Sequence, residues 1–308
     1  MKISPLHNLF ADFGSTFGER DGWEVALLAG RSQEDEYRTI RTGAALLDRT
    51  PLGKLRLTGS DRLTWLQGMV SNDLNRPGPE FTSIDCFILD ATGHVISDCQ
   101  VTCYPDSLIL LLPISQVDVI YERLQGFLIL EDVEITEQSE YLSAINLQGP
   151  RASEVLSKYS PGANEVHFSH NRTGSGGVDI IAPKSEIEAI ARKLVDLGAQ
   201  PAGERAFQAA RIESGIPQFG TDFGPSTLAP EIGIESTHIS YTKGCYVGQE
   251  IVARIQSRGH TNRFLTGFLI DGDRPPELSA KLTLTDDPSN EIGWITSAKM
   301  MACSKGTI

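Results

Sequence analysis

Hydrophobic and polar residues alternate along several short stretches of this chain, and a period of two is typical of half-buried β-strands. The alternating stretches are residues 54–58, 84–89 and 95–104, and the short apolar run 108–112 is a further predicted strand. Turn sequences at 91–93 (Ala-Thr-Gly) and 104–107 (Tyr-Pro-Asp-Ser) separate the last three of these four segments. The pattern predicts a meander of three neighbouring strands.

Three other segments repeat apolar residues every three or four positions, which predicts amphipathic helices. Ser60, Ser115 and Ser185 stand where these helices should begin, and serine is a preferred N-cap residue. Asp118 and Glu188 lie three residues after the last two serines, the spacing of a capping box. Strands and helices in this order, without regular β-α-β alternation, predict an α+β fold.

Composition narrows the class of protein. A chain of 308 residues suits two or three domains, and 40% hydrophobic with 22% charged residues is typical of a globular protein. A net charge of −13 disfavours a nucleic-acid partner held by phosphate contacts. The longest apolar run, residues 108–113, is too short to span a membrane. We expect a cytoplasmic protein with no membrane partner, unless an organellar leader has been removed.

The cysteines and histidines predict neither disulfides nor a metal site. The five cysteines are Cys86, Cys99, Cys103, Cys245 and Cys303. An odd number without a C-x-x-C pair does not indicate a disulfide framework, and the six histidines show no metal-ligand spacing. Residues 173–177, Thr-Gly-Ser-Gly-Gly, read as a flexible loop that lacks the spacing of a nucleotide site.

Residues 243–250, Lys-Gly-Cys-Tyr-Val-Gly-Gln-Glu, carry an unusual combination of groups. Cys245 lies between Gly244 and Gly248, which permit a close approach of the backbone to a ligand or another segment. Lys243 would favour the thiolate of Cys245 if the two side chains met. The residues alone leave two interpretations open: a reactive thiol beside a ligand, or a tight structural turn with a buried thiol.

This run resembles the K-G-C-Y-x-G-Q-E signature of the YgfZ-type folate-binding proteins, which are relatives of the glycine cleavage T-protein. The flanking segments 251–254 and 258–259 are similar to the family's continuation. Further similarity to the T-protein superfamily covers most of the chain in the expected order, at residues 59–73, 147–152 and 211–217.

The resemblance implies three domains in a clover-leaf arrangement, with mixed and largely antiparallel sheets, around a central site for tetrahydrofolate. We expect residues 1–262 to form a folate-binding region of two interleaved α+β subdomains. We expect residues 263–308 to form an incomplete C-terminal β-barrel.

The resemblance also implies the site residues. T-proteins carry paired acids where this chain has Ser97 and Asp98, so a catalytic acid remains at this place only if it corresponds to Asp98. Glu213 is expected to hold the pterin ring through a bidentate pair of hydrogen bonds. The alternative role of Glu213 is a salt bridge within its own helix, for instance with Arg211.

Basic and aromatic residues around the signature complete the expected site. Arg254, Arg258 and Arg263 are candidates for the negative glutamate tail of folate, although each could equally be a surface cation. Lys243 is a further candidate for binding folate. Tyr246 is a candidate for stacking on the pterin, and Cys245 is the candidate reactive group.

Two functions follow from the resemblance. The first is a tetrahydrofolate-binding protein that supports the assembly or maintenance of iron–sulfur enzymes, with those enzymes or assembly proteins as partners. Such a protein would reside in the cytoplasm, or in the mitochondrial matrix after loss of a leader. The alternative is an aminomethyltransferase that passes a one-carbon unit to tetrahydrofolate.

Overall fold

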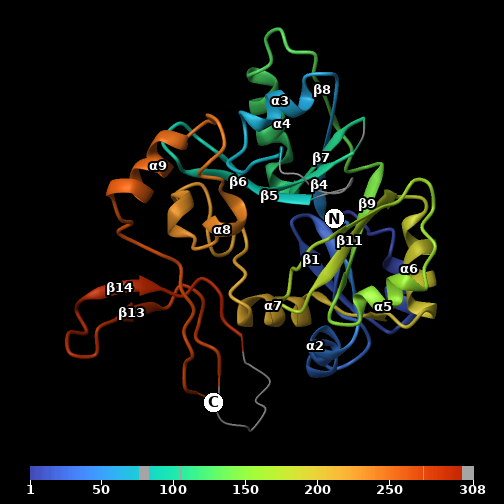
Figure 1. Cartoon of the computed structure of the whole chain (residues 1–308). Helices are drawn as coiled ribbons and strands as arrows, with labels where there is room; N and C mark the ends of the chain where they lie inside the picture. Colours follow the sequence, from blue (N-terminus) through green and yellow to red (C-terminus); the bar gives the residue numbers. More distant parts are fainter. Residues whose placement is uncertain (76–82, 105, 273, 300–308) are drawn as a thin grey trace.

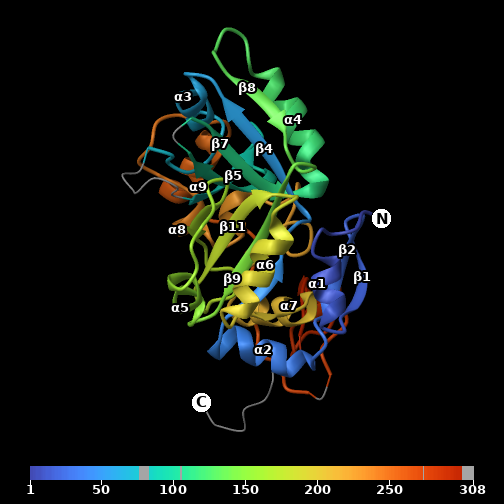
Figure 2. The same cartoon turned by 90° about the vertical axis from the view of Figure 1, so that its right-hand side faces the viewer.

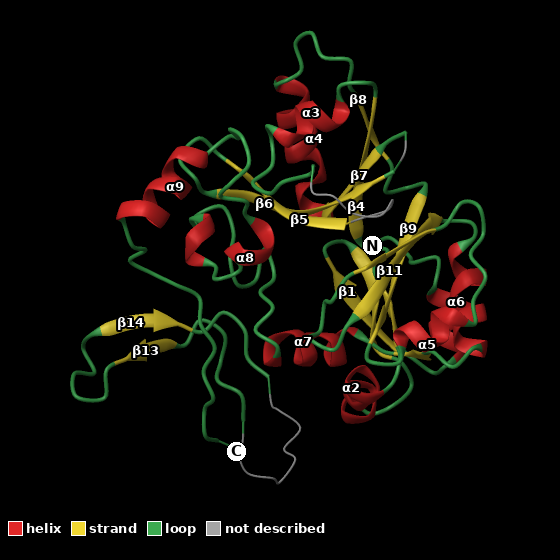
Figure 3. Ribbon diagram, in the orientation of Figure 1, coloured by secondary structure: helices red, strands yellow, loops and turns green. Residues whose placement is uncertain are grey.

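Two five-stranded sheets lie at the centre of the computed structural model, which describes residues 1–75, 83–104, 106–272 and 274–299 (Figure 1). Helices cover the outer face of each sheet, and residues 259–272 and 274–299 run beside them (Figure 3). The expected α+β architecture with largely antiparallel sheets is confirmed. All neighbouring strands in these two sheets are antiparallel except for one parallel pair, β3 and β12.

The first sheet has the strand order β5-β6-β7-β4-β8, and all of its neighbours are antiparallel. Its strands are β4 (Leu52–Thr58), β5 (Ser83–Leu89), β6 (Val95–Cys103), β7 (Leu108–Pro113) and β8 (Glu134–Glu137). The predicted meander is confirmed as β5-β6-β7. Side chains from α3 (Arg62–Gln67) and α4 (Val117–Gly126) share a hydrophobic core with one face of this sheet.

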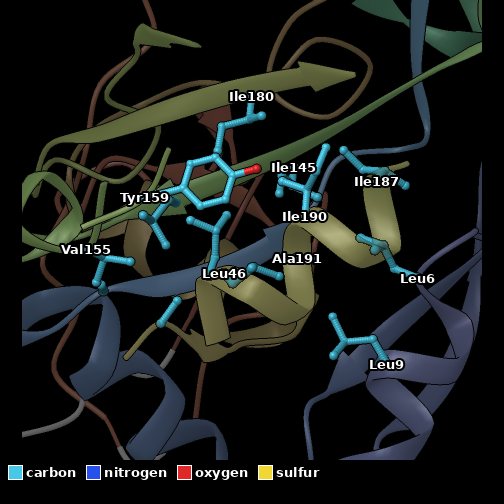
Figure 4. Close-up of a cluster of buried hydrophobic side chains, with 14 of the residues drawn as sticks. Leu6, Leu9, Leu46, Ile145, Val155, Tyr159, Ile180, Ile187, Ile190 and Ala191 are labelled. Atoms are coloured by element: carbon cyan, nitrogen blue, oxygen red, sulfur yellow. The ribbon is translucent and has the colours of Figure 1, made fainter. Parts of the chain in front are cut away.

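The second sheet has the strand order β10-β11-β9-β3-β12, in which β12 pairs parallel to β3. Its strands are β3 (Ala45–Asp48), β9 (Leu142–Gln148), β10 (Val166–Ser169), β11 (Gly177–Pro183) and β12 (Gln200–Pro201). Three helices, α1 (His7–Asp12), α5 (Ala152–Ser157) and α6 (Ile187–Asp196), pack on one face through a core that includes Leu46, Ile145 and Ile190 (Figure 4).

The remaining elements extend this framework. Helices α2 (Gln33–Thr42) and α7 (Glu204–Glu213) share a smaller core with β3. The others are the hairpin β1 (Thr16–Arg20) and β2 (Trp23–Leu28), the 3-10 turns η1 (Ile114–Gln116) and η2 (Ala229–Glu231), and the helices α8 (Glu235–His238) and α9 (Gln249–Arg258). None of the described helices is long and apolar enough to cross a membrane.

The inner faces of the two sheets meet each other (Figure 2). Ile109 and Leu111 of β7 pack against Ala144 of β9 and Ile181 of β11 in a core that both sheets share. Burial of such side chains contributes about 1.5–3 kcal/mol each, so this contact fixes the relative position of the sheets. Polar residues beside it are therefore held at defined distances across the interface.

The predicted serine caps are wrong at all three helices. The residues before α3, α4 and α6 are Asp61, Gln116 and Glu186, whose backbones are already close to helical, and none of them caps through its side chain. The chain enters α4, for example, through the 3-10 turn η1. A side-chain cap needs an extended backbone, which Ser32 provides at the start of α2 by accepting from the Asp35 N–H.

The described part of 263–299 contains one hairpin, formed by β13 (Lys281–Thr283) and β14 (Glu291–Trp294). A closed barrel is not found among these residues, so the expected C-terminal barrel is not confirmed. The division of the chain at residue 262 stays a prediction.

Candidate functional site

Polar side chains gather where the two central sheets face each other. The inter-sheet cluster consists of Asp85, Asp98, Gln100, His170, Arg172, Asp179 and His238. Side chains alternate between the two faces of β6. Cys99 and Val101 enter the core beneath α3 and α4 on one face. Asp98 and Gln100 consequently point to the inner face.

Asp179 of β11 is the most deeply buried acid of the cluster, with a side chain only 2% exposed. Arg172 donates to it through Nε and through Nη2, the latter at 2.6 Å from Oδ2, and His170 Nδ1 lies 3.0 Å from Oδ2. Burial alone would raise the pKa of this carboxyl, but Arg172 and His170 outweigh burial and hold the pKa well below its usual range. Asp179 is therefore a permanent anion at the centre of the cluster.

Two contacts join the sheets through polar groups. His170 Nε2 lies 3.3 Å from Oδ1 of Asp85 on β5, and Arg172 Nη2 donates to Gln100 Oε1 on β6 at 3.1 Å. Burial and the neighbouring Arg172 would lower the pKa of His170, but Asp179 and Asp85 raise it overall. The imidazole therefore lies between two carboxylates that favour its charged form.

Asp98 pairs with His238, the last residue of α8, at 3.4 Å between Oδ1 and Nε2. Ser97 lies next to Ile88 in the cross-strand register and is fully buried on the opposite face of β6. The acid that faces the inter-sheet cluster is thus Asp98, which keeps a carboxylate at this place in the chain.

Several buried polar atoms on these inner faces have no hydrogen-bond partner among the described residues, and three of them bear on the site. They are Gln100 Nε2, Thr102 Oγ1 and Asn146 Oδ1. An unpaired buried polar atom costs about 1–3 kcal/mol, so such atoms are uncommon unless a ligand or water completes them. Together they offer a donor, a hydroxyl and an acceptor.

Glu213, the expected pterin anchor, lies at the end of α7, where Arg41 Nη2 donates to its Oε2 at 2.6 Å and Tyr37 donates to the same oxygen. The same Arg41 donates through Nη1 to the Thr173 carbonyl oxygen, next to Arg172 of the inter-sheet cluster. The role of Glu213 toward a pterin stays a prediction.

The loop that the sequence presents as a flexible glycine-rich segment is the link between Glu213 and the cluster. Ser214 Oγ donates to the Thr173 carbonyl at 2.7 Å. A side chain at Gly174, whose φ is +80°, would place its Cβ 2.2 Å from Ser214 Oγ. Glycine is therefore required here for close packing between the loop and the end of α7.

Lys243 of the signature is buried, and its ammonium donates to the carbonyl oxygens of Gln67, Val70 and Asn72 at 2.6, 2.7 and 2.8 Å. Burial lowers the pKa of Lys243 to about 8. All three N–H groups of the ammonium donate to these carbonyl oxygens. A ligand could therefore accept a hydrogen bond from Lys243 only if it displaced one of them. The expectation that Lys243 binds folate stays a prediction that this geometry disfavours.

Tyr246 is buried in the core that Phe87, Val95 and Val252 also form, and Lys243 Nζ lies 5.1 Å from the centre of its ring. Burial raises the pKa of Tyr246 to about 12. Packing thus accounts for this aromatic ring, and stacking on a pterin stays a prediction.

Cys245 is exposed on the loop between α8 and α9, so the interpretation of a buried thiol in a structural turn is wrong. The loop is nevertheless tightly seated. A side chain at Gly248, whose φ is +85°, would place its Cβ 2.5 Å from the carbonyl oxygen of Asp90. The signature therefore holds a solvent-accessible thiol on a firmly packed turn.

Arg254 and Arg258 are both exposed on α9. Arg254 pairs with Glu250 one helical turn earlier, at 2.6 Å. An exposed pair of this kind contributes little to stability. Both arginines remain free to meet an anion, and their predicted role toward the folate tail is untested by these contacts.

A recess of about 410 Å³ lies away from these residues, lined by parts of α2, α5 and the segment after α6. Its arginines are occupied: Arg38 by Asp35, Arg151 by Glu154, and Arg31 by the oxygens of Gln200 and Pro201. In the described ranges, no group of three or more His, Cys, Asp or Glu residues is arranged to hold a metal ion.

Sequence reasoning missed six members of the inter-sheet cluster: Asp85, Gln100, His170, Arg172, Asp179 and His238. One signal was available, since Asp85 and Asp179 each interrupt a strand of apolar residues, Ile-Asp-Cys-Phe and Val-Asp-Ile-Ile. Buried charge in a strand needs a partner. The partners themselves lie far away in the sequence and become neighbours only in the fold.

Comparisons with known proteins agree with this architecture. The GCVT N-terminal domain matches residues 6–174. The aminomethyltransferase of Caldanaerobacter subterraneus subsp. tengcongensis is 23% identical over 96% of this chain and 84% of its own. That of Thermoanaerobacter pseudethanolicus is 24% identical over 89% of this chain and 80% of its own.

The crystal structure of the glycine cleavage system aminomethyltransferase T from Bartonella henselae superposes with a TM-score of 0.82 and 19% identity, covering 96% of this chain and 85% of the other. This likeness shows a shared fold. The family match covers more than half of the chain and includes the strands that carry Asp85 and Asp98. The chain therefore belongs to the GCVT family, within the superfamily of proteins that resemble the glycine cleavage T-protein.

Proposed function

We propose that this protein binds tetrahydrofolate between its two central sheets, against the inter-sheet cluster, and uses it to accept a one-carbon unit. The observation that carries the proposal is the set of unpaired buried atoms on the inner faces: Gln100 Nε2, Thr102 Oγ1 and Asn146 Oδ1. Family membership supports it as well, because relatives across most of the chain are named aminomethyltransferase.

The residues present fit a reduced pterin chemically. A pterin ring carries N–H donors together with carbonyl and ring-nitrogen acceptors, and these match an acceptor at Asn146, a donor at Gln100 and either role at Thr102. Tetrahydrofolate would supply the nitrogens that take up the carbon unit. Asp98, with one carboxylate oxygen turned to His238, is the group able to hold or move a proton beside them.

The named activity of the relatives favours aminomethyl transfer as the use of the bound folate. In that reaction the carbon leaves a sulfur carrier for two folate nitrogens, ammonia departs, and the two displaced folate protons end on the carrier thiol and on ammonia. No electron acceptor is required. The position of the Asp98 carboxyl, on the inner face and beside His238, suits this group to relay one such proton.

A second use of folate, support of iron–sulfur enzymes, is favoured by one separate observation. Cys245 is exposed on the loop whose sequence resembles the YgfZ-type signature. An accessible thiol is what exchange with a partner protein requires. This candidate function depends on Cys245, whereas aminomethyl transfer depends on Asp98.

Calorimetric titration with tetrahydrofolate tests the shared part of both functions. The variant Gln100→Leu should bind roughly tenfold more weakly, since one buried hydrogen bond of about 1–2 kcal/mol is lost. Gln125→Leu on α4 is the matched control and should bind as the parent does. If the parent shows no binding at millimolar tetrahydrofolate, the proposal is refuted.

Two further assays separate the candidate uses. Ammonia release from an aminomethylated lipoyl carrier, lost in Asp98→Asn, would support aminomethyl transfer. Reduced activity of iron–sulfur enzymes in cells that carry Cys245→Ser would support the accessory function. Cys103→Ser, which removes a half-buried thiol elsewhere, is the control for that experiment.

A further inference from the structure

His238 lies directly behind the Asp98 carboxylate, in a position to control its charge. Nε2 is 3.4 Å from Oδ1 of Asp98, and the imidazole is 13% exposed while the carboxylate is 34% exposed. Among the described residues, His238 is the one side chain that forms an ion pair or hydrogen bond with this carboxylate. Asp98 is therefore approachable from one side and backed by a histidine on the other.

The orientation of the imidazole is fixed by two neighbours. Its ring stacks on Phe87 of β5, with centroids 4.8 Å apart and an interplanar angle of 25°. Nδ1 lies 2.7 Å from Oγ1 of Thr237. With Nδ1 engaged in this way, Nε2 is the nitrogen that faces Asp98.

The Thr237 hydroxyl has one proton and two possible acceptors. Its Oγ1 lies 2.9 Å from the Ile234 carbonyl and 2.7 Å from Nδ1 of His238. With Nε2–H directed at Asp98, a hydroxyl that donates to Ile234 leaves Nδ1 to donate its own proton to Oγ1, and His238 is then an imidazolium. A hydroxyl that donates to Nδ1 leaves the ring neutral. Nε2–H faces Asp98 in both cases, so His238 changes charge while only a hydroxyl rotates.

We infer that Asp98 and His238 form one acid–base unit, in which His238 holds the proton and the Asp98 carboxylate meets the ligand. His238 is a positioning residue here, since it acts through Asp98. The part of this inference that concerns a ligand rests on the proposed binding of tetrahydrofolate, whereas the coupling of the two side chains does not.

The surrounding charges support this assignment. Burial would lower the pKa of His238, but the hydrogen bond and charge of Asp98, together with Asp85 on β5, raise it overall. His170, which follows β10, acts in the opposite direction. The positive charge of Arg172 is neutralised by its contact with Asp179.

Proton NMR titration of the histidine ring signals tests the coupling without any ligand. The pKa of His238 should lie above its ordinary value in the parent and fall by roughly one pH unit in Asp98→Asn, because an opposite charge within hydrogen-bond distance is removed. The matched variant His170→Gln should leave it unchanged or raise it. An unchanged pKa of His238 in Asp98→Asn overturns the inference.

The pH profile of tetrahydrofolate affinity tests the role of His238 in binding. His238→Gln keeps an N–H donor toward Asp98 but cannot be positively charged. Loss of the cation should move the acid limb of the profile upward by roughly one pH unit, whereas a purely structural histidine would be replaced by glutamine without such a shift. A superimposable profile overturns the inference.

A negative result in the NMR titration can be distinguished from a negative result in the binding profile. If the parent binds no tetrahydrofolate, the proposed function falls, and the NMR comparison alone decides whether the pair exists. If Asp98→Asn does not fold, as judged by its amide spectrum, the His238→Gln profile decides.

Discussion

Replacing Lys243 by methionine separates a structural lysine from a ligand-binding one. Methionine is similar in length but donates nothing to the carbonyl oxygens of Gln67, Val70 and Asn72, which lie 2.6–2.8 Å from the ammonium. Hydrogen bonds to a charged group contribute about 1.5–3 kcal/mol each. Part of this loss is offset, because methionine does not bury a charge and Lys243 is only 9% exposed.

We therefore expect Lys243→Met to lose about 2–4 kcal/mol of unfolding free energy, a large share of the 5–15 kcal/mol that is usual for a folded domain. Urea denaturation measures this as a lower midpoint with an unchanged slope. Cys245→Ser, two residues away and exposed, is the control and should leave the midpoint where it is.

The opposite outcome would refute the structural role. If Lys243→Met unfolds at the same urea concentration as the parent yet loses its affinity for tetrahydrofolate, the lysine serves the ligand rather than the loop. A parallel loss of stability and affinity would instead show that the ligand depends on a correctly packed segment 67–72.

Two further predictions concern buried charge. Burial lowers the pKa of Lys54 to about 7 against the partial opposition of Asp48, so the unfolded chain binds more protons from about pH 7 to 10.5 and stability should rise over that interval. Lys54→Met should remove the rise between about pH 7 and 8 and reduce it at higher pH, where Lys243 also contributes, and an unchanged slope in urea unfolding would contradict this explanation. Asp179→Asn should cost about 3–5 kcal/mol, because it leaves Arg172 buried without its partner. Calorimetry would count against that estimate if the melting temperature fell no further than in the surface variant Glu154→Gln.

Local pattern was sufficient for four of the five strands of the first sheet, all but β8, and insufficient for the helix starts. The period of two identified the strands that became β5, β6 and β7, because one face of each is buried against helices. The serine caps failed since a cap depends on the backbone angles of one residue, and the preceding turn sets those angles. Ser60, for example, bonds to Asp132 instead of capping α3.

The candidate site likewise contains residues that the sequence could identify and residues whose roles required the structure. The signature 243–250 was recognisable because its residues are contiguous, and the exposed thiol fits the expectation of a reactive group. The role of Lys243 could not be predicted, because an ammonium satisfies a ligand and three carbonyl oxygens equally well. The choice between Ser97 and Asp98 required knowing which face of β6 turns inward.

By itself the sequence determined four strands of the first sheet, the absence of regular β-α-β order, and the resemblance to the T-protein superfamily. These properties depend on residues that are close together in the sequence, so they can be predicted from local sequence patterns. The tertiary structure alone decided that Asp85, Asp98, His170, Asp179 and His238 meet between two sheets. Buried charges select partners by distance in space, and the packing of one sheet on the other sets those distances.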